Sequence, residues 1–305
     1  MKYVSLFAGI GGFDLALNRL GHECVYANDF DKYCKITYDK NFKSGRFKGK
    51  TRPNGGQDIF NGRVKSNTSS AKGQQQQGFG IDNNGLDTTP IQEVRAKDIP
   101  KHDLLVGGFP CQSFSIAGKR RGFEDTRGTL FFDIARIIKH HKTRYIILEN
   151  VKGLLSHDSG RTFKTIISTL VELGYDLQWQ VLNSKNFGVP QNRERVFIVG
   201  HLRGTPRPKV FPIGGSNEMG NGKGQVANTL TSNYYKGAAG SRPMILQKLD
   251  EGMRIRRLTP MECERLQGFP DNWTEGVSDT QRYKQLGNAV TVNVVQVIAE
   301  KLISK

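Results

Sequence analysis

The stretch KYVSLFAGIGGFDLAL, residues 2–17, joins an apolar run to a glycine cluster and then to a second apolar run. Residues 2–8 predict a short buried strand, and residues 13–20 predict a helix that begins directly after the glycines. Glycines at such a turn let a ligand approach the backbone closely, and the helix N-terminus faces polar ligand groups. The stretch therefore predicts the first βα unit of an α/β fold, with either a ligand-binding loop or an ordinary tight βα turn at its glycines.

The same alternation continues along the chain. Further strands are predicted at 24–27, 103–106, 144–149, 175–182 and 195–201, and further helices at 31–42, 130–140, 162–173, 260–267 and 291–303. Strands that alternate with helices build βαβ units, so we expect an α/β domain with a doubly wound, mostly parallel sheet. Ligands of such sheets bind beyond the carboxyl ends of the strands. Asp29, Cys111 and Glu149 all fall at predicted strand ends.

The charge balance points to a polyanionic partner. The chain has 45 Lys and Arg against 28 Asp and Glu, a formal net charge of +17. This favours nucleic acid first and an anionic membrane surface second; a solvated basic surface is the alternative. Neither a signal-peptide pattern nor a window near the roughly 20 apolar residues of a membrane span is present, so we expect a cytoplasmic protein with no membrane partner.

Two segments interrupt the alternating pattern. Residues 43–89 are rich in Gly, Asn, Ser, Gln and Lys and include QQQQ at 74–77, which predicts a flexible insertion; a basic arm that touches DNA backbone is the alternative. Residues 203–256 have many glycines, short β-like runs and basic residues, which indicates a small separate domain. The main domain would then comprise residues 1–202 and 257–305.

Cysteine usage directs attention to one position. Cys24, Cys34, Cys111 and Cys263 form no CxxC pair and no zinc-like cluster, so no metal site is expected. Most lone cysteines are small buried hydrophobes. Cys111 differs, because it lies in GGFPCQSFSIAG, residues 107–118, directly after a predicted strand. A nucleophilic thiol needs exposure and nearby positive charge; the strand end supplies exposure, and the basic residues at 119–121 and 127 supply charge.

Glu149 and two arginines of QNRER, residues 191–195, are expected near this thiol. Thiol, carboxyl and arginine together suit methyl transfer to cytosine C5. A thiolate that adds to C6 makes C5 nucleophilic, a carboxyl at N3 eases the addition, and the thiol leaves after C5 loses its proton. The alternatives are a buried thiol, a structural acid and a surface arginine cluster, each plausible singly.

These elements resemble the bacterial and phage DNA (cytosine-5)-methyltransferase family. The matching stretches occur in the family's order and cover most of residues 1–201 and 256–305; they are FAGIGGF (7–13), NDFD (28–31), GFPCQSFS (108–115), RGTLFFD (127–133), ENV (149–151), PQNRERVFIVG (190–200), RRLTPMECERLQGFPD (256–271) and QLGNAV (285–290). PCQ, ENV and QxRxR together are highly specific to the family.

The resemblance implies a Rossmann-like methyltransferase with S-adenosyl-L-methionine as methyl donor and S-adenosyl-L-homocysteine as product. Cys111 would be the nucleophile, Glu149 would engage N3, and Arg195, supported by Arg193, would hold the base. The residues implied to line the cofactor pocket are Phe7, Gly9, Ile10, Gly12, Asp29, Phe30, Ile91, Pro110, Leu130, Asn288 and Val290.

One family feature is missing. The family usually has an acid that meets the adenine amino group, just before a hydrophobic residue upstream of the third strand. The matching positions here are Pro90 and Ile91. Asp87 and Asp98 lie nearby, and neither is assigned this role.

The resemblance also implies double-stranded DNA as partner. The target base must be rotated out of the duplex, at a cost of a few kcal/mol. The loop after Cys111 and the small domain, whose GQVANTLT (224–231) resembles a target-recognition signature, would hold the DNA. The implied DNA-contacting residues are Gln112, Ser115, Lys119, Arg120, Arg127, Ser216, Asn217, Thr229, Tyr234 and Lys236.

Alternatives remain at this stage. An RNA cytosine methyltransferase would share many of these motifs, and a non-catalytic nucleic-acid binder could keep the cofactor pocket. An amino-directed methyltransferase would carry a (D/N/S)PP(Y/F) loop, which the sequence lacks. The family further implies a monomer that serves restriction-modification or phage protection, with a cognate restriction endonuclease as a possible partner.

Overall fold

The computed structural model describes residues 1–43, 85–110, 130–214, 226–236, 244–249 and 252–303. Its centre is a seven-stranded sheet with the strand order β3-β2-β1-β4-β5-β8-β6. The strands are β1 (Lys2–Leu6), β2 (Glu23–Asn28), β3 (Leu86–Asp87), β4 (Leu104–Gly108), β5 (Tyr145–Val151), β6 (Tyr175–Asn183) and β8 (Glu194–Leu202).

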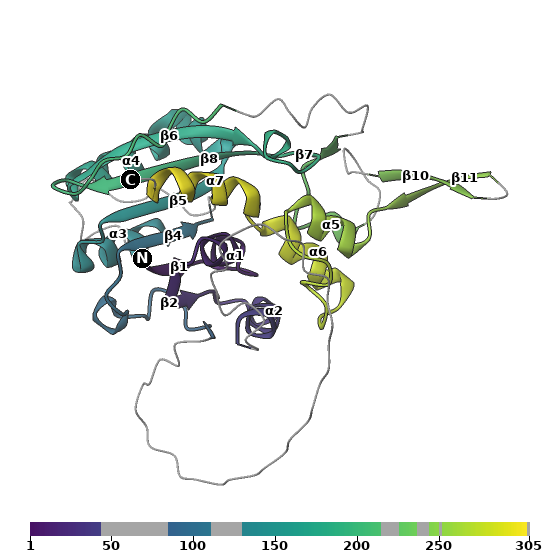
Figure 1. Cartoon of the computed structure of the whole chain (residues 1–305), viewed down its shortest axis with the longest axis horizontal. Coiled ribbons are helices and arrows are strands. Elements are labelled where there is room, and N and C mark those ends of the chain that lie inside the picture. Colours follow the sequence, from purple (N-terminus) through teal and green to yellow (C-terminus); the bar gives the residue numbers. More distant parts are fainter. Residues whose placement is uncertain (44–84, 111–129, 215–225, 237–243, 250–251, 304–305) are drawn as a thin grey trace, which may run out of the picture.

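The first five strands in chain order are parallel, and β8 lies antiparallel between β5 and β6. The helices that cover the sheet are α1 (Gly12–Arg19), α2 (Lys32–Phe42), α3 (Leu130–His141), α4 (Arg161–Glu172) and α7 (Val292–Ile303). The predicted doubly wound, mostly parallel α/β fold is confirmed (Figure 1).

Two hydrophobic cores fill the spaces above and below the sheet. Alternate strand residues point to opposite faces, so Leu104 and Val106 of β4 join one core while Leu105 joins the other. The first core packs α1, α2 and α7 on one face, and the second packs α3 and α4 on the other. The last helix therefore completes the same layer as the first one.

Two shorter helices precede α7, namely α5 (Pro260–Leu266) and α6 (Asp279–Asn288). A capping box begins α5, in which the side chain of Thr259 accepts from the N–H of Glu262 and the Glu262 carboxylate accepts from the N–H of Thr259. The predicted helix at 260–267 is thus present. The sequence interpretation missed α6, whose composition is largely polar apart from its buried Tyr283 and Leu286.

Two predicted boundaries need correction. The end of the insertion predicted at 43–89 is β3, which pairs with β2 and extends the sheet; residues 44–84 lie outside the described part. The predicted start of the small domain, residue 203, is placed too early in the chain, because Val210, Phe211 and Ile213 are buried in the first core. Two glutamines of β6, at 178 and 180, bind the backbone of residues 208–213 through their side-chain amides.

Leu230 and Tyr234 belong to the same core, so the described part of 226–236 also packs on the main domain. Within it, β9 (Ala227–Asn228) pairs with β7 (Gln191–Asn192). The antiparallel hairpin of β10 (Met244–Leu249) and β11 (Gly252–Arg257) projects from the body on the side of α5 and α6, and both chain ends lie on the opposite side (Figure 1).

The helical stretch Asp279–Ile303 is long and apolar enough to cross a membrane by length and composition. The most apolar part of this stretch is 61% buried inside the protein, as expected of a core helix.

Candidate active site

An acid at the end of β2 shapes the glycine loop that follows β1. The backbone N–H of Gly9 donates to Oδ2 of Asp29 over 2.8 Å, and that of Asp31 donates to Oδ1 over 2.9 Å. Burial raises the pKa of Asp29, and these two N–H groups act in the opposite direction. Each carboxylate oxygen keeps a free lone pair, so Asp29 can still accept from the hydroxyl groups of a ribose.

Open space and an exposed ring lie at this loop. Gly9 has a φ of 56°, which favours glycine, and a Cβ built there would meet no atom within 4 Å. Phe7 also has a positive φ, 55°, an uncommon conformation for a bulky side chain. The ring of Phe30 is 72% exposed beside Asp29. A glycine loop, an acid and an exposed aromatic ring fit an adenine nucleoside ligand.

The chain's end contributes to the same region. A Cβ at Gly12 would lie 2.8 Å from Cγ1 of Val290, so only glycine allows α1 to begin this close to the QLGNAV segment. Asn288 is exposed and Ile10 is buried. Of the other implied pocket residues, Pro110 is exposed, Leu130 is half-buried and Ile91 is buried.

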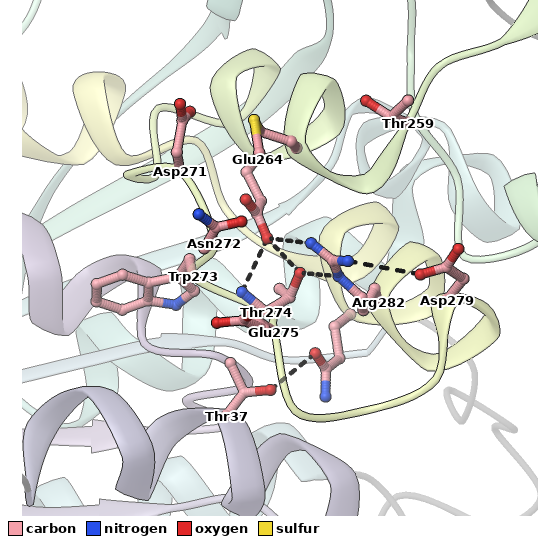
Figure 2. Close-up of polar contacts among 12 residues, drawn as sticks. Thr37, Thr259, Glu264, Asp271, Asn272, Trp273, Thr274, Glu275, Asp279 and Arg282 are labelled. Atoms are coloured by element: carbon pink, nitrogen blue, oxygen red, sulfur yellow. Dashed lines mark hydrogen bonds and ion pairs between the residues drawn. The ribbon is translucent and has the colours of Figure 1, made fainter.

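Residues 271–275, which we call the strap and of which Trp273 and Thr274 are buried, support the glycine loop. Nε1–H of Trp273 donates to the carbonyl oxygen of Ile10 over 2.9 Å. The next residue, Thr274, donates from its backbone N–H to the buried carboxylate of Glu264 over 2.8 Å, and Nη2 of Arg282 lies 3.2 Å from the same oxygen. Figure 2 shows these side chains converging from α5, α6 and the segment between them. The network fixes the position from which Trp273 reaches the loop.

The predicted acid and arginine form a buried ion pair. Oε1 of Glu149, at the end of β5, lies 3.1 Å from Nε of Arg195 on the neighbouring β8, and their side chains are 12% and 15% exposed. Burial raises the pKa of the Glu149 carboxyl, although Arg195 and Arg193 both act to lower it. Burial likewise lowers the pKa of Arg195. The site thus holds a carboxyl with an increased tendency to keep its proton.

Arg193 is bonded to backbone carbonyl groups from three segments. Its Nη1 donates to the carbonyl oxygen of Leu230 over 2.9 Å, and its Nη2 donates to those of Gly287 (3.1 Å) and Ala289 (2.8 Å). Burial lowers its pKa to about 9. Because its Nη groups are committed to backbone carbonyls, Arg193 ties three segments together, an arrangement compatible with the supporting role predicted for it beside Arg195.

Strand β4 ends directly at the predicted nucleophile. Gly108 pairs with Glu149, and Nδ2 of Asn150 donates to the carbonyl oxygen of Phe109 over 2.8 Å. This bond fixes the backbone two residues before Cys111. Cys111 itself lies outside the described residues.

The two acids near the third strand are engaged elsewhere. The carboxylate of Asp87 accepts from the hydroxyl of Tyr26 over 2.7 Å and from the backbone N–H of Thr89 over 2.9 Å. Asp98 pairs with Arg95 over 2.6 Å. Pro90, at the family's acid position, is exposed. Both carboxylates thus have partners within the protein.

Three of the implied DNA-contacting residues are described. Tyr234 is 2% exposed and its hydroxyl accepts from the N–H of Leu258, so the prediction that it reads DNA is wrong. Thr229 donates its hydroxyl proton to the carbonyl oxygen of Asn192 over 2.6 Å, so this proton is not available to a phosphate in this arrangement. Lys236 is exposed. The others lie outside the described residues: Gln112, Ser115, Lys119, Arg120, Arg127, Ser216 and Asn217.

Sequence reasoning missed Trp273, Asn150 and Gln191 as supporting residues. Gln191 donates to the carbonyl oxygen of Leu266 over 2.8 Å and accepts from the N–H of Leu230 over 2.9 Å. Its place in QNRER was the available signal. Within the described part of the chain, no group of three or more His, Cys, Asp or Glu side chains is placed to hold a metal ion.

Comparison with known proteins decides the family. The family model for C-5 cytosine-specific DNA methylase matches residues 1–60, 76–217 and 210–304. The chain belongs to this family. It is a DNA (cytosine-5)-methyltransferase by family.

Relatives of this methylase match along nearly the whole chain. It is 38% identical to Type II methyltransferase M1.ScrFI of Lactococcus lactis subsp. cremoris, over 99% of this chain and 78% of the relative. It is 32% identical to Type II methyltransferase M.HhaI of Haemophilus parahaemolyticus, over 98% and 93%.

Solved structures share the fold. A mutant of Spodoptera frugiperda DNMT2 has a TM-score of 0.69 at 20% identity, over 99% of both chains. A methyltransferase encoded within an Escherichia coli prophage has a TM-score of 0.60 at 16% identity, over 99% of this chain and 98% of that one.

Proposed function

We propose that this methylase transfers a methyl group from S-adenosylmethionine to C5 of a cytosine rotated out of duplex DNA within a specific short sequence. The observation that carries the proposal is the buried pair of Glu149 and Arg195 at the sheet edge that also carries the glycine loop and Asp29. When bound, S-adenosylmethionine supplies an electrophilic methyl group and leaves as S-adenosylhomocysteine. Asp29, Phe30 and the loop of residues 7–12 would hold it.

The protein's own groups would act in sequence on the base. The thiolate of Cys111 forms a bond to C6, while the Glu149 carboxyl donates a hydrogen bond to N3 and accommodates the electron density that moves into the ring. Arg195 keeps the carboxyl oriented and contacts the base. C5 then takes the methyl group, a base removes the C5 proton, and the bond from sulfur to C6 breaks, which restores the aromatic ring and the free thiolate.

The elevated pKa of Glu149 supports its place in this scheme. A carboxyl can donate a hydrogen bond to N3 only while it holds a proton, and burial favours that form. The paired Arg195 keeps the group oriented.

Trapping with a 5-fluorocytosine duplex tests the covalent step. Fluorine at C5 cannot leave as a proton does, so the wild-type protein with S-adenosylmethionine should form a permanent adduct with the duplex. The matched variant Cys111→Ser should form none. Normal turnover by that variant, or no adduct with the wild type, would contradict the proposal.

The biological setting follows from the relatives, which are named Type II methyltransferases. We propose that this protein is a cytoplasmic monomer that serves restriction-modification or phage protection, with a cognate endonuclease as partner in the first case. Expression in a host without cytosine methylation, followed by mapping of 5-methylcytosine at base resolution, tests activity and gives the recognised sequence. Uniformly unmodified DNA would contradict the proposed activity.

A further inference from the structure

Three cationic side chains from separate parts of the sequence gather around two tyrosine rings. Nζ of Lys284 lies 5.2 Å from the ring centroid of Tyr235, and Nζ of Lys236 lies 5.9 Å from it. The guanidinium carbon of Arg257 lies 5.4 Å from the ring centroid of Tyr283. We call Lys236, Arg257 and Lys284, with these two rings, the Tyr235 cluster. It lies where α6, the segment at 226–236 and the end of β11 meet.

The base of the Tyr235 cluster is rigid. Tyr283 donates from its hydroxyl to the carbonyl oxygen of Leu258 over 2.8 Å, and the hydroxyl of Tyr234 accepts from the N–H of Leu258 over 2.7 Å. The rings of Tyr234 and Tyr283 pack edge to face with centroids 5.3 Å apart. Nη1 of Arg257 donates to the carbonyl oxygen of Tyr235 over 3.0 Å. The cations are therefore presented by a fixed support and not by a loose loop.

The three positive charges have no acidic partner in the described part of the chain, where no ion pair within 4 Å involves Lys236, Arg257 or Lys284. The neighbouring Arg256 differs, because both of its Nη groups bind the carboxylate of Glu262 over 2.8 Å. Like charges repel, and the ring faces offset only part of that cost. A bound polyanion would remove the repulsion.

The Tyr235 cluster is joined to the active site through short, buried connections. The backbone of Thr231 and Ser232 packs against Gly287 of α6 so closely that no Cβ fits there. Arg193 bonds to the carbonyl oxygens of Leu230 and Gly287, on both sides of that contact. Two residues further along the chain, Arg195 pairs with Glu149. A ligand on the Tyr235 cluster is thus held by the same elements that position the catalytic pair.

We propose that the Tyr235 cluster is a phosphate clamp, which binds the backbone of duplex DNA beside the site that receives the target base. The inference rests on the proposed function, because it takes DNA as the ligand. Lysine ammonium groups and the remaining guanidinium nitrogens contact phosphate oxygens, which carry charge but no sequence information. The clamp therefore contributes affinity and placement equally for every DNA sequence.

The salt dependence of DNA binding tests the clamp in the full chain. The variants are Lys236→Gln, Lys284→Gln, Arg257→Gln, and the triple variant, on a duplex with the mapped recognition sequence and on one without it. Each neutralised contact should make the negative slope of log K against log salt less steep by about 0.9. The affinity should fall by the same factor on both duplexes. The loss should appear in the dissociation constant for DNA and in kcat/KM for DNA, because a phosphate contact stabilises the bound ground state and the transition state alike.

Two controls separate the clamp from a general effect of surface charge. Lys101→Gln removes an exposed lysine before β4, at the opposite end of the strands, and should leave the slope unchanged. Arg257→Lys keeps the charge and should retain most of the slope. If the wild type binds DNA and the triple variant shows the same slope, the clamp is wrong and the proposed function stands. If the wild type binds no duplex DNA, the proposed function fails, and the clamp with it.

Discussion

Glu149 is subject to two opposed influences at its carboxyl group. Its burial disfavours the charged carboxylate, while Arg195 at 3.1 Å favours it, and burial has the larger effect on the pKa. Burial therefore increases the tendency of this glutamate to hold the proton with which it can donate a hydrogen bond.

Replacing Glu149 by glutamine should lower kcat by about 10²–10⁴-fold. Glutamine still donates a hydrogen bond, but it cannot follow the charge that develops on the ring. Single-turnover methyl transfer at saturating DNA measures the effect, with the DNA dissociation constant measured in parallel. Glu194→Gln is the matched control, since Glu194 is a half-exposed acid paired with Lys152, and its kcat should be unchanged. An equal loss in both variants would remove the special role of Glu149.

The contribution of Glu149 to the free energy of unfolding should also depend on pH, in a direction that follows from its raised pKa. The folded pKa of Glu149 is raised above its ordinary value of 4.5, so the folded protein keeps this proton longer than the unfolded chain does. Its contribution to stability is therefore fully present below pH 4.5 and is lost as pH rises through the raised pKa. The free energy of unfolding of wild type minus that of Glu149→Gln should decline over this range in chemical denaturation. A difference that grew with pH would contradict the raised pKa.

At the scale of elements, the strap of residues 271–275 connects α5 and α6 to the glycine loop. Asn41 of α2 donates to the carbonyl oxygen of Trp273 over 2.9 Å, and Lys40 donates to that of Glu275 over 2.7 Å. Trp273 in turn donates to Ile10. Helix α2 thus holds the strap from one side, and the strap in turn holds the glycine loop through the carbonyl group of Ile10.

Trp273→Phe should weaken cofactor binding without a matching loss of kcat. The phenyl ring keeps most of the packing, but the buried carbonyl of Ile10 loses its donor, which costs about 1–3 kcal/mol. Because the loop then no longer has one fixed shape, part of that cost should appear as a raised dissociation constant for S-adenosylmethionine. Calorimetry measures this constant. Trp179→Phe, at a 50% exposed tryptophan on β6, is the control and should change nothing. An equal cofactor affinity in Trp273→Phe would show that the strap does not position the loop.

The elements around the site differ in how far local sequence determines them. The strand at 2–6 and the helices at 32–42 and 130–141 follow from periodic apolar residues, and all were predicted. β3 has two residues, too few for a periodic signal, and α6 is largely polar. The bond between Trp273 and Ile10 spans 263 positions, so no local pattern could indicate it.

The site residues also differ in how far the sequence alone could predict them. Asp29, Glu149 and Arg195 were found because the family motifs contain them, and strand ends bring them to one edge. Arg193 was also named, as a support for Arg195, but its bonding partners could not be predicted, because only the fold places the carbonyl groups of Leu230 and Gly287 at its guanidinium.

At the scale of the whole molecule, Arg193 connects segments that lie far apart in the sequence. This one buried side chain binds the carbonyl groups of Leu230, of Gly287 in α6 and of Ala289 just before α7, and α7 packs beside α1. Arg193→Met should lower the free energy of unfolding by about 3–5 kcal/mol, because buried carbonyls lose a charged donor. Urea denaturation measures it. Arg203→Met, at an exposed pair with Asp176, should cost under about 1 kcal/mol. If both variants lost the same small amount of unfolding free energy, apolar packing alone, and not Arg193, would hold these segments together.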